Sequence, residues 1–535
     1  MILLPKMPSV SLPVDSPDPE PDASASIDQQ IRARIMDPQG ADIQTLVDQA
    51  LETHTADAVV SQMLLPGMRA AVDDHLAGHS ILPDLLESAE VVRRGLDYLG
   101  PRAAFRRGSV MIATLPGDVH HVGKALLVSI LSACGYRVHD LGNQVPIEAI
   151  VDTALRLQPD AIGLSALLVS TSRQMPACVQ QLDARGVHIP VLVGGAAINR
   201  AFGRRSGVLR DGRVYEPGVF YCKDVFEGLA TLDTLVDATR RAALVAQTRE
   251  EVEAELHAVS VPPIRPSPRA SRTGPRHDIA VPVPPYWGSR KVTADLPDVW
   301  RGLDRNTLFR YHWGGYRVAA AEDFDRLVRD VYEPTLATLS EDARRNGGWL
   351  QPLIVSGYFA CNTDGDGLVI YASPESDVAL GRLSFPRQSD GERLCLADYF
   401  RPAASGERDV VALQAVTTGP RAGEYIEELL RAGAYARMLY VSGLAAATAE
   451  ALAGYAHNLV RHDLGLGSAQ SVRFSWGYPA CPDLAEQRMV LALLEAEAQI
   501  GLRLSQSNNL DPEHSTAAFI VHHPEAKYFA VRGAA

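Results

Sequence analysis

The stretch SVMIATLPGDVHHVG, residues 109–123, decides the fold of the first half of this chain. It begins as a β-rich apolar run and continues through a Pro-Gly loop into a helical pattern near residues 124–135. Further helical patterns lie near 146–158 and 171–186, and they separate three more β-rich runs: residues 136–142, 160–168 and 189–195. Strands that alternate with helices in this way predict a doubly wound, parallel α/β sheet over residues 103–245.

The loop after the first run carries the motif Asp118-x-His120-x-x-Gly123. In a Rossmann-like sheet this loop lies at the carboxyl ends of the strands, where open α/β sheets bind their ligands. A metal-bound histidine commonly donates its other ring N–H to a carboxylate, and Asp118 can accept that hydrogen bond from His120. His121 is the other histidine of this loop that could ligate a metal, and we interpret it as a solvated loop residue.

Two short motifs of small residues follow in order, SAL at 165–167 and GG at 194–195. The order and spacing of all three motifs resemble the signature of the cobalamin-binding domain in methionine synthase and corrinoid proteins. The resemblance implies that His120 ligates cobalt and that Thr171 completes a relay with Asp118. It also implies a narrow slot for the nucleotide tail of the cofactor, formed by the residues of the motifs: Gly123, Ser165, Leu167, Gly194 and Gly195.

The composition disfavours several classes of partner. The chain has 535 residues, of which 46% are hydrophobic and 21% charged, and its formal net charge is −13. A chain of this length forms several domains, and its acidic balance disfavours nucleic acid and anionic membranes as partners. Because it lacks an 18-residue apolar run and a signal-like segment, we expect a soluble, cytoplasmic protein. The six cysteines are dispersed without CxxC pairs, which predicts reduced thiols and no zinc site.

The segments that flank the predicted sheet differ from it in character. Residues 1–27 are rich in Pro, Ser and Asp, and we expect a disordered tail. Residues 28–102 show helical periodicity, which predicts a small bundle, and the resemblance implies that this bundle is a cap over the corrin ring. Beyond the sheet we expect one long charged helix over about residues 223–256. Residues 246–289 then form the helix end and a Pro-rich linker.

The second half of the chain is identified by the string RFSWGYPACP, residues 473–482. Together with CLADYF (395–400) and HPEAKYFAV (523–531), it resembles the activation domain of methionine synthase, which binds S-adenosylmethionine (SAM). The resemblance implies a separate α+β domain over residues 290–535.

The residue types of this region suit SAM, which carries a carboxylate, an ammonium and a sulfonium. Arg473 can bind the carboxylate through two parallel hydrogen bonds. The resemblance adds two acidic contacts, two tyrosines and a turn glycine where the backbone can approach the ligand: Asp304, Glu450, Tyr478, Tyr528 and Gly477.

Three features depart from the family. No stretch is long enough for the two barrel domains that bind homocysteine and methyl-folate, so we do not expect full methionine synthase activity from this chain alone. His75 stands where an aromatic residue normally covers the upper corrin face, so it can supply acid–base chemistry or upper-face ligation. The alternative for His75 is an exposed helix-end histidine. The loop at residues 510–517 replaces an apolar loop, which changes the expected orientation of SAM.

The resemblance implies a reaction between cobalamin and SAM. We first expect a cobalamin-dependent methyltransferase in which cob(I)alamin attacks SAM and the methyl group passes to an unidentified acceptor, which is a small molecule or is presented by a partner. A low-potential electron donor such as a flavodoxin would supply the reductant. In a variant, SAM is the sole substrate and is cleaved or cyclised through its aminocarboxypropyl carbon, with release of methylthioadenosine. A third interpretation is a corrinoid carrier that serves separate methyltransferases.

Overall fold

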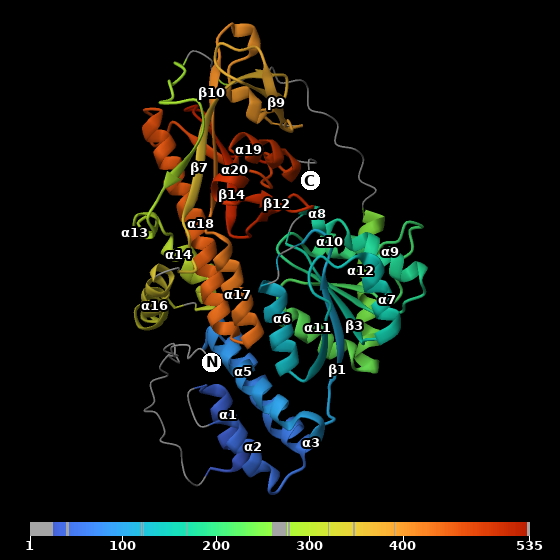
Figure 1. The fold of residues 1–535 in the computed structure, drawn as a ribbon. Helices are drawn as coiled ribbons and strands as arrows, with labels where there is room; N and C mark the ends of the chain where they lie inside the picture. Colours follow the sequence, from blue (N-terminus) through green and yellow to red (C-terminus); the bar gives the residue numbers. More distant parts are fainter. Residues whose placement is uncertain are drawn as a thin grey trace. The chain divides into compact units, whose positions relative to one another are not determined.

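The computed structural model describes most of the chain: residues 25–38, 42–118, 120, 122–167, 169–258, 275, 279–318, 320–345, 348–389 and 391–531. The described residues form two compact units (Figure 1). The first unit draws on 1–261, 306–341 and 426–443, and the second on 262–305, 342–425 and 444–535. The expected tail over 1–27 lies outside the described residues except at its last three positions, and so does most of the expected Pro-rich linker.

The predicted N-terminal helical bundle is confirmed. Its helices are α1 (Ile27–Met36), α2 (Ile43–Leu51), α3 (Ala56–Val59), α4 (Leu65–Leu76) and α5 (Leu82–Leu99). Ile31 and Ile35, one turn apart on α1, are fully buried, as expected for the core-facing stripe of an amphipathic helix. The longest helix, α5, packs against α1, α2 and α4.

The predicted parallel sheet is also confirmed, with the strand order β2-β1-β3-β4-β5. The strands are β1 (Gly108–Thr114), β2 (Tyr136–Asp140), β3 (Ala161–Ser165), β4 (Val191–Gly194) and β5 (Val219–Cys222). The helices around them are α6 (Val122–Ala133), α7 (Ile147–Leu157), α8 (Val169–Ser172), α9 (Met175–Ala184), α10 (Arg200–Ser206), α11 (Val225–Leu235) and α12 (Ala238–Ala258). In this doubly wound order the chain reverses between β1 and β3, which is where such sheets bind ligands.

Three details differ from the sequence predictions. The fifth strand, β5, was not predicted. The single helix expected over 223–256 is wrong, because α11 and α12 are separate helices. Asp237 lies between them, and its Oδ1 accepts hydrogen bonds from the N–H groups of Thr239 and Arg240 at 3.0 and 3.1 Å, which caps the second helix. The helix expected over 171–186 is divided into α8 and α9.

Alternate residues of β1 face different surroundings. Met111 and Ala113 belong to a core shared with α7 and α9. Val110 and Ile112 point to the other face of the sheet, where α6 and α11 lie and where the two side chains line a cavity. Because alternate side chains of a strand point to opposite faces, one face of the sheet packs into the core and the other lines the cavity.

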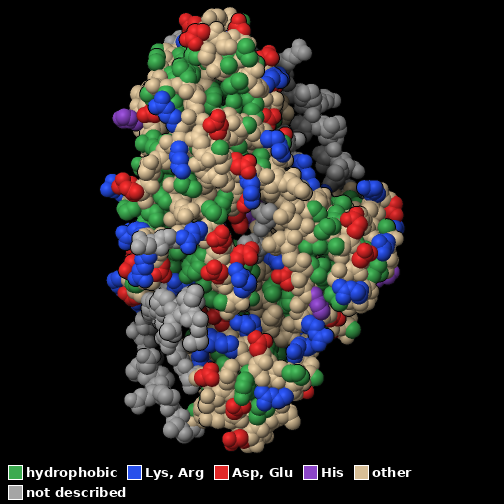
Figure 2. All heavy atoms as spheres, in the orientation of Figure 1, with side chains coloured by type: hydrophobic (Ala, Val, Ile, Leu, Met, Phe, Trp, Pro, Cys, Tyr) green, Lys and Arg blue, Asp and Glu red, His purple; other side chains and the backbone are tan. Residues whose placement is uncertain are grey.

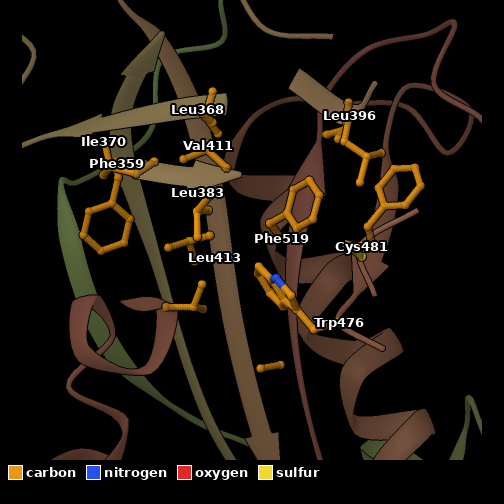
Figure 3. Close-up of a cluster of buried hydrophobic side chains, with 14 of the residues drawn as sticks. Phe359, Leu368, Ile370, Leu383, Leu396, Val411, Leu413, Trp476, Cys481 and Phe519 are labelled. Carbon is orange, nitrogen blue, oxygen red and sulfur yellow. The ribbon is translucent and has the colours of Figure 1, made fainter. Parts of the chain in front are cut away.

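The second unit is built on an antiparallel sheet with the strand order β11-β14-β10-β7-β8-β9, and β6 pairs with β7. The strands are β6 (Gly288–Thr293), β7 (Leu353–Asp364), β8 (Gly367–Tyr371), β9 (Ala379–Ser384), β10 (Asp409–Thr417), β11 (Val472–Ser475) and β14 (Ser515–Val521), with a two-stranded ribbon of β12 (Arg503–Leu504) and β13 (Leu510–Asp511). Strand β10 is buried along its whole length. Figure 3 shows the core on this sheet. In this core the ring centroids of Trp476 and Phe519 lie 5.3 Å apart.

The helices of the C-terminal half are divided between the two units, because residues 306–341 and 426–443 belong to the first unit. They are α13 (Leu296–Trp300), α14 (Arg305–Thr307), α15 (Ala321–Leu327), α16 (Glu333–Arg344), α17 (Pro420–Ala432), α18 (Tyr435–Asp463), α19 (Gln487–Leu493) and α20 (Ala496–Ile500).

On the face drawn in Figure 2, basic and acidic side chains are interspersed over the surface.

Candidate functional site

The loop after β1 holds His120 in a fixed orientation. Its Nδ1 lies 2.9 Å from Oδ1 of Asp118, and its backbone N–H donates to the same oxygen at 3.1 Å. The other oxygen of Asp118 accepts the N–H of Leu167 at 2.7 Å and the hydroxyl of Thr171 at 3.0 Å. The structure therefore brings together His120, Asp118 and Thr171, the three members of the predicted relay.

The protonation of this relay follows from its hydrogen bonds. Asp118 is fully buried, which by itself raises its pKa, but the hydrogen bonds from His120 and from the Leu167 N–H outweigh burial and keep the pKa below its usual value. An ionised Asp118 accepts a proton-bearing Nδ1, so Nε2 of His120 carries the lone pair. The imidazole is partly exposed, at 26%, so Nε2 can reach a ligand.

The donor set fits cobalt in a corrin better than a metal held by protein alone. Among the residues that the structure describes, no group of three or more His, Cys, Asp or Glu side chains could hold a metal ion. A single imidazole with a carboxylate behind it suits a metal whose other ligands come from a macrocycle. His121, the rival ligand, lies outside the described residues.

An apolar cavity of about 290 Å³ opens beside this loop, between the sheet and helices α6 and α11. Its sheet wall includes Gly163 and Ser165 of β3 and Gly194 of β4. These positions share the face of Val110 and Ile112, and the two glycines leave room because no side chain projects from them. Of the predicted slot residues, four line the cavity: Gly123, Ser165, Gly194 and Gly195.

Gly195 is required by a close backbone approach. Its φ is +119°, and a Cβ there would lie 2.0 Å from the carbonyl oxygen of Ala166. No other residue fits this turn without moving the backbone. The GG and SAL motifs thus meet at the carboxyl ends of β3 and β4. Leu167 takes part through its N–H to Asp118, while its side chain is exposed.

His75 lies behind the cavity wall. Its side chain is buried, so the alternative of an exposed helix-end histidine is wrong. Nδ1 lies 2.9 Å from the carbonyl oxygen of Ser80, and the ring centroid lies 5.0 Å from that of Phe226, which lines the cavity. Burial lowers the pKa of His75. A catalytic role for His75 stays a prediction.

Sequence reasoning missed most of the residues that line the cavity, among them Gly163 and Lys124. Gly163 lies inside a strand, and the signal was a glycine within an otherwise apolar β-run. Lys124 follows the first motif directly, is 5% exposed and pairs with Asp140. The signal was a lysine at the start of an otherwise apolar helix.

The predicted SAM residues of the second unit gather around β11 and α18. Nη2 of Arg473 donates to Oε2 of Glu450 at 2.9 Å, while Nη1 is buried and has no hydrogen-bond partner among the described residues. The Tyr528 hydroxyl donates to the carbonyl oxygen of Arg473 at 2.6 Å. An unpartnered guanidinium nitrogen beside an exposed carboxylate suits a ligand that carries both a carboxylate and an ammonium.

The other expected SAM residues lie in the same unit. Gly477 has φ +88°, and its N–H donates to the carbonyl of Cys481 at 2.9 Å, so the expected turn is present. Tyr478 is exposed. The segment before Asp304 is tied to α18 two residues from Glu450, because the Trp300 indole N–H donates to Thr448 at 3.0 Å.

Replacing Arg473 with methionine is expected to weaken SAM binding by about 10- to 100-fold, because a charge-assisted contact to a carboxylate is lost. Isothermal titration calorimetry with SAM measures this change in the dissociation constant. Arg488→Met, at an exposed arginine of the same unit, is the matched control and should leave the affinity unchanged. Equal affinity of Arg473→Met and the unsubstituted chain would remove Arg473 from the site.

Family models match three regions of the chain. Residues 27–99 and 108–259 each match a B12 binding domain, and residues 316–534 match the activation domain of vitamin B12 dependent methionine synthase. Methionine synthases of Mycobacterium tuberculosis and Mycobacterium leprae are 33% and 32% identical over 94% of this chain. The chain covers 46% of each, and so spans about half the length of these curated relatives.

Two solved structures are also similar. The MetH reactivation domain bound to AdoHcy is 27% identical, with a TM-score of 0.42, over 47% of this chain and 83% of that one. The methanol:cobalamin methyltransferase complex MtaBC from Methanosarcina barkeri is 24% identical, with a TM-score of 0.36, over 40% of this chain and 82% of that one.

The family matches identify cobalamin-binding regions in this chain, and the His120 loop lies in the second of them. Over these regions and the activation-domain region the chain is similar to the cobalamin-dependent methionine synthases. No helix within the described residues is long and apolar enough to cross a membrane.

Proposed function

We propose that this chain is an enzyme that binds cobalamin at the His120 loop and SAM beside Arg473, and that it takes the methyl group of SAM for transfer to an acceptor. The observation that carries the proposal is the relay of His120, Asp118 and Thr171 beside a glycine-walled cavity. The unpartnered Nη1 of Arg473 supports the SAM site. The acceptor is a small molecule or is presented by a partner, and a low-potential donor such as a flavodoxin supplies electrons.

When bound and reduced, cobalamin supplies a cobalt nucleophile for a carbon next to the sulfonium. The chain's own residues orient the ligating nitrogen. Asp118 accepts the hydrogen bond from Nδ1 of His120, so that Nε2 would be free to hold the cobalt. The Thr171 hydroxyl and the Leu167 N–H donate to the other carboxylate oxygen and hold it in place.

The residues at the second site orient SAM. Nη1 of Arg473 binds the carboxylate, and the Glu450 carboxylate faces the ammonium. The Tyr528 hydroxyl donates to the backbone carbonyl of Arg473, which helps to hold the guanidinium beside Glu450 of α18. Holding the sulfonium in one orientation is what makes a single carbon of SAM reactive.

A second candidate keeps SAM as the sole substrate, which is cleaved or cyclised through its aminocarboxypropyl carbon. The altered loop at 510–517 favours it. Strand β13 pairs with β12, and Arg503 Nε lies 2.8 Å from Oδ2 of Asp511. His514 is buried at the start of β14, the strand that pairs with the Arg473 strand. A loop built in this way changes which carbon of the sulfonium is presented.

The nucleoside product separates these candidates. The chain is incubated with hydroxocobalamin, a strong reductant and SAM, and nucleosides are quantified by mass spectrometry. We expect S-adenosylhomocysteine, up to one equivalent per bound cofactor without an acceptor, and less with His120→Ala, because that variant binds less cofactor. Methylthioadenosine instead would overturn methyl transfer in favour of the second candidate. Binding of both molecules with neither product would leave a corrinoid carrier that serves separate methyltransferases.

A further inference from the structure

Two side-chain contacts join the start of strand β11 to helix α18. Arg473 donates to Glu450 at 2.9 Å, and Oγ of Ser471 lies 2.9 Å from Nε2 of His457, within hydrogen-bond distance. Ser471 and Arg473 are two residues apart on the extended segment, and Glu450 and His457 are seven apart on the helix, so each of these pairs shares one face. The contact between Ser471 and His457 therefore lies beside the Arg473–Glu450 ion pair, along the same seam.

The helix surface between the two contacts is open. Gly454 lies between Glu450 and His457 on α18, and a Cβ there would meet no atom within 4 Å. Glu450 is exposed, whereas Ser471 is buried and His457 is half-buried. The ion pair can therefore be reached by a ligand, while the contact between Ser471 and His457 belongs to the more buried part of the seam.

Binding of an α-amino acid group disturbs the ion pair but not its neighbour. A ligand carboxylate competes with Glu450 for the guanidinium of Arg473, and a ligand ammonium competes with Arg473 for the carboxylate of Glu450. Strand β11 stands first in the order β11-β14-β10, and its ladder hydrogen bonds run to β14. The contact between Ser471 and His457 uses neither charged group, so it still joins β11 to α18 when the ion pair opens.

The imidazole of His457 is neutral at pH 7. Burial, together with the nearby Arg461 of its own helix and Arg473 of β11, lowers the pKa of His457 to about 4. A neutral ring can hold Ser471 without adding another positive charge beside Arg473. The charge of the Arg473 guanidinium is then left for Glu450 and for a ligand.

We propose that His457 is a positioning residue of the SAM site, which through Ser471 holds Arg473 at the spacing from Glu450 that fits the carboxylate and ammonium of an α-amino acid group. The inference rests on the SAM site of the proposed function. His457 acts through the short backbone segment between Ser471 and Arg473, and not on the reacting atoms. A ligand without the amino-acid group gains nothing from this spacing.

Two ligands test the role of His457: S-adenosylhomocysteine and methylthioadenosine, two thioethers of which only the first carries the amino-acid group. Dissociation constants are measured by isothermal titration calorimetry, and the unsubstituted chain should prefer S-adenosylhomocysteine. His457→Leu should weaken S-adenosylhomocysteine binding by about 5- to 10-fold, as expected for the loss of one hydrogen bond, and leave methylthioadenosine binding unchanged. His457→Gln, which keeps a polar group for Ser471, should retain both affinities. His462→Leu, at an exposed histidine of the same helix, is the matched control.

A double substitution tests whether His457 acts through Arg473. In the Arg473→Met chain, His457→Leu should cause no further loss of S-adenosylhomocysteine affinity, because the guanidinium that it positions is gone. Thermal unfolding of each variant reports whether the fold is intact.

The outcomes separate this inference from the proposed function. Equal weakening of both ligands by His457→Leu, no change in either affinity, or the same further loss in the Arg473→Met chain would overturn this inference alone. Equal affinity of the unsubstituted chain for the two ligands would overturn the Arg473 site and this inference together. Failure of methyl transfer would leave these affinities unchanged.

Discussion

Replacing Gly163 with leucine is expected to weaken cobalamin binding by about 100-fold while the chain stays folded. Gly163 lies inside β3 with its missing side chain directed into the cavity, and a Cβ there would lie 3.4 Å from the nearest atom, Cγ1 of Ile112. The leucine therefore fits the backbone but occupies the space of the nucleotide tail. Blocking ~120 Å² of apolar contact at ~25 cal/mol per Å² removes about 3 kcal/mol, or about 100-fold in affinity.

Side chains of increasing size at residue 163 give a graded test. Affinity should fall in the order Gly, Ala, Val, Leu, as measured by titration with hydroxocobalamin, while the unfolding temperature of the apo chain stays the same or rises. Gly423→Leu is the matched control, because a Cβ at this glycine of α17 meets nothing within 4 Å and the residue lies outside the cavity. Cobalamin binding that survived Gly163→Leu would mean that the tail lies elsewhere.

The second large effect is expected at His120. Electron paramagnetic resonance of bound cob(II)alamin reports the axial nitrogen through its hyperfine splitting. A chain labelled uniformly with ¹⁵N, with unlabelled cobalamin, should give doublets, because the ligand nitrogen comes from the protein. His120→Ala should remove the doublets and weaken binding by about 10- to 100-fold.

The neighbour of His120 supplies the control. Asp118→Asn should retain the doublets but weaken binding by about 10-fold, since the amide no longer fixes the imidazole tautomer as a carboxylate does. Triplets in the labelled, unsubstituted chain would show that the cofactor keeps its own base on cobalt. That outcome would contradict the relay even though the three side chains are in contact.

The contact between Asp118 and His120 could be predicted because the two residues share one loop. Thr171 was expected from the family resemblance alone, and the structure places it after β3, the neighbour of β1. Lys124 escaped prediction because its partner Asp140 lies at the end of another strand, β2. A buried lysine cannot be told from a surface lysine until the sheet is assembled.

The second unit was predictable in class but not in arrangement. The RFSWGYPACP string indicated the domain, yet β11 pairs with β14, and β14 pairs with β10, across long sequence separations. Such pairings leave no periodic signal in the chain. The break between α11 and α12 was missed for a different reason: Asp237 reads as one more charge in a charged helix, and its capping role appears only with its hydrogen bonds.

The division of the parallel sheet into a packed face and a hollow face has a thermodynamic consequence. Atoms that line the hollow lack packing partners until a ligand fills it, so a cofactor bound there, as proposed, would complete a second hydrophobic core. Folding of this domain and vitamin binding are then linked equilibria. Once binding is near saturation, each further tenfold rise in free cofactor adds about 1.4 kcal/mol to the free energy of unfolding. The unfolding temperature of the chain is therefore expected to rise with the concentration of free cofactor.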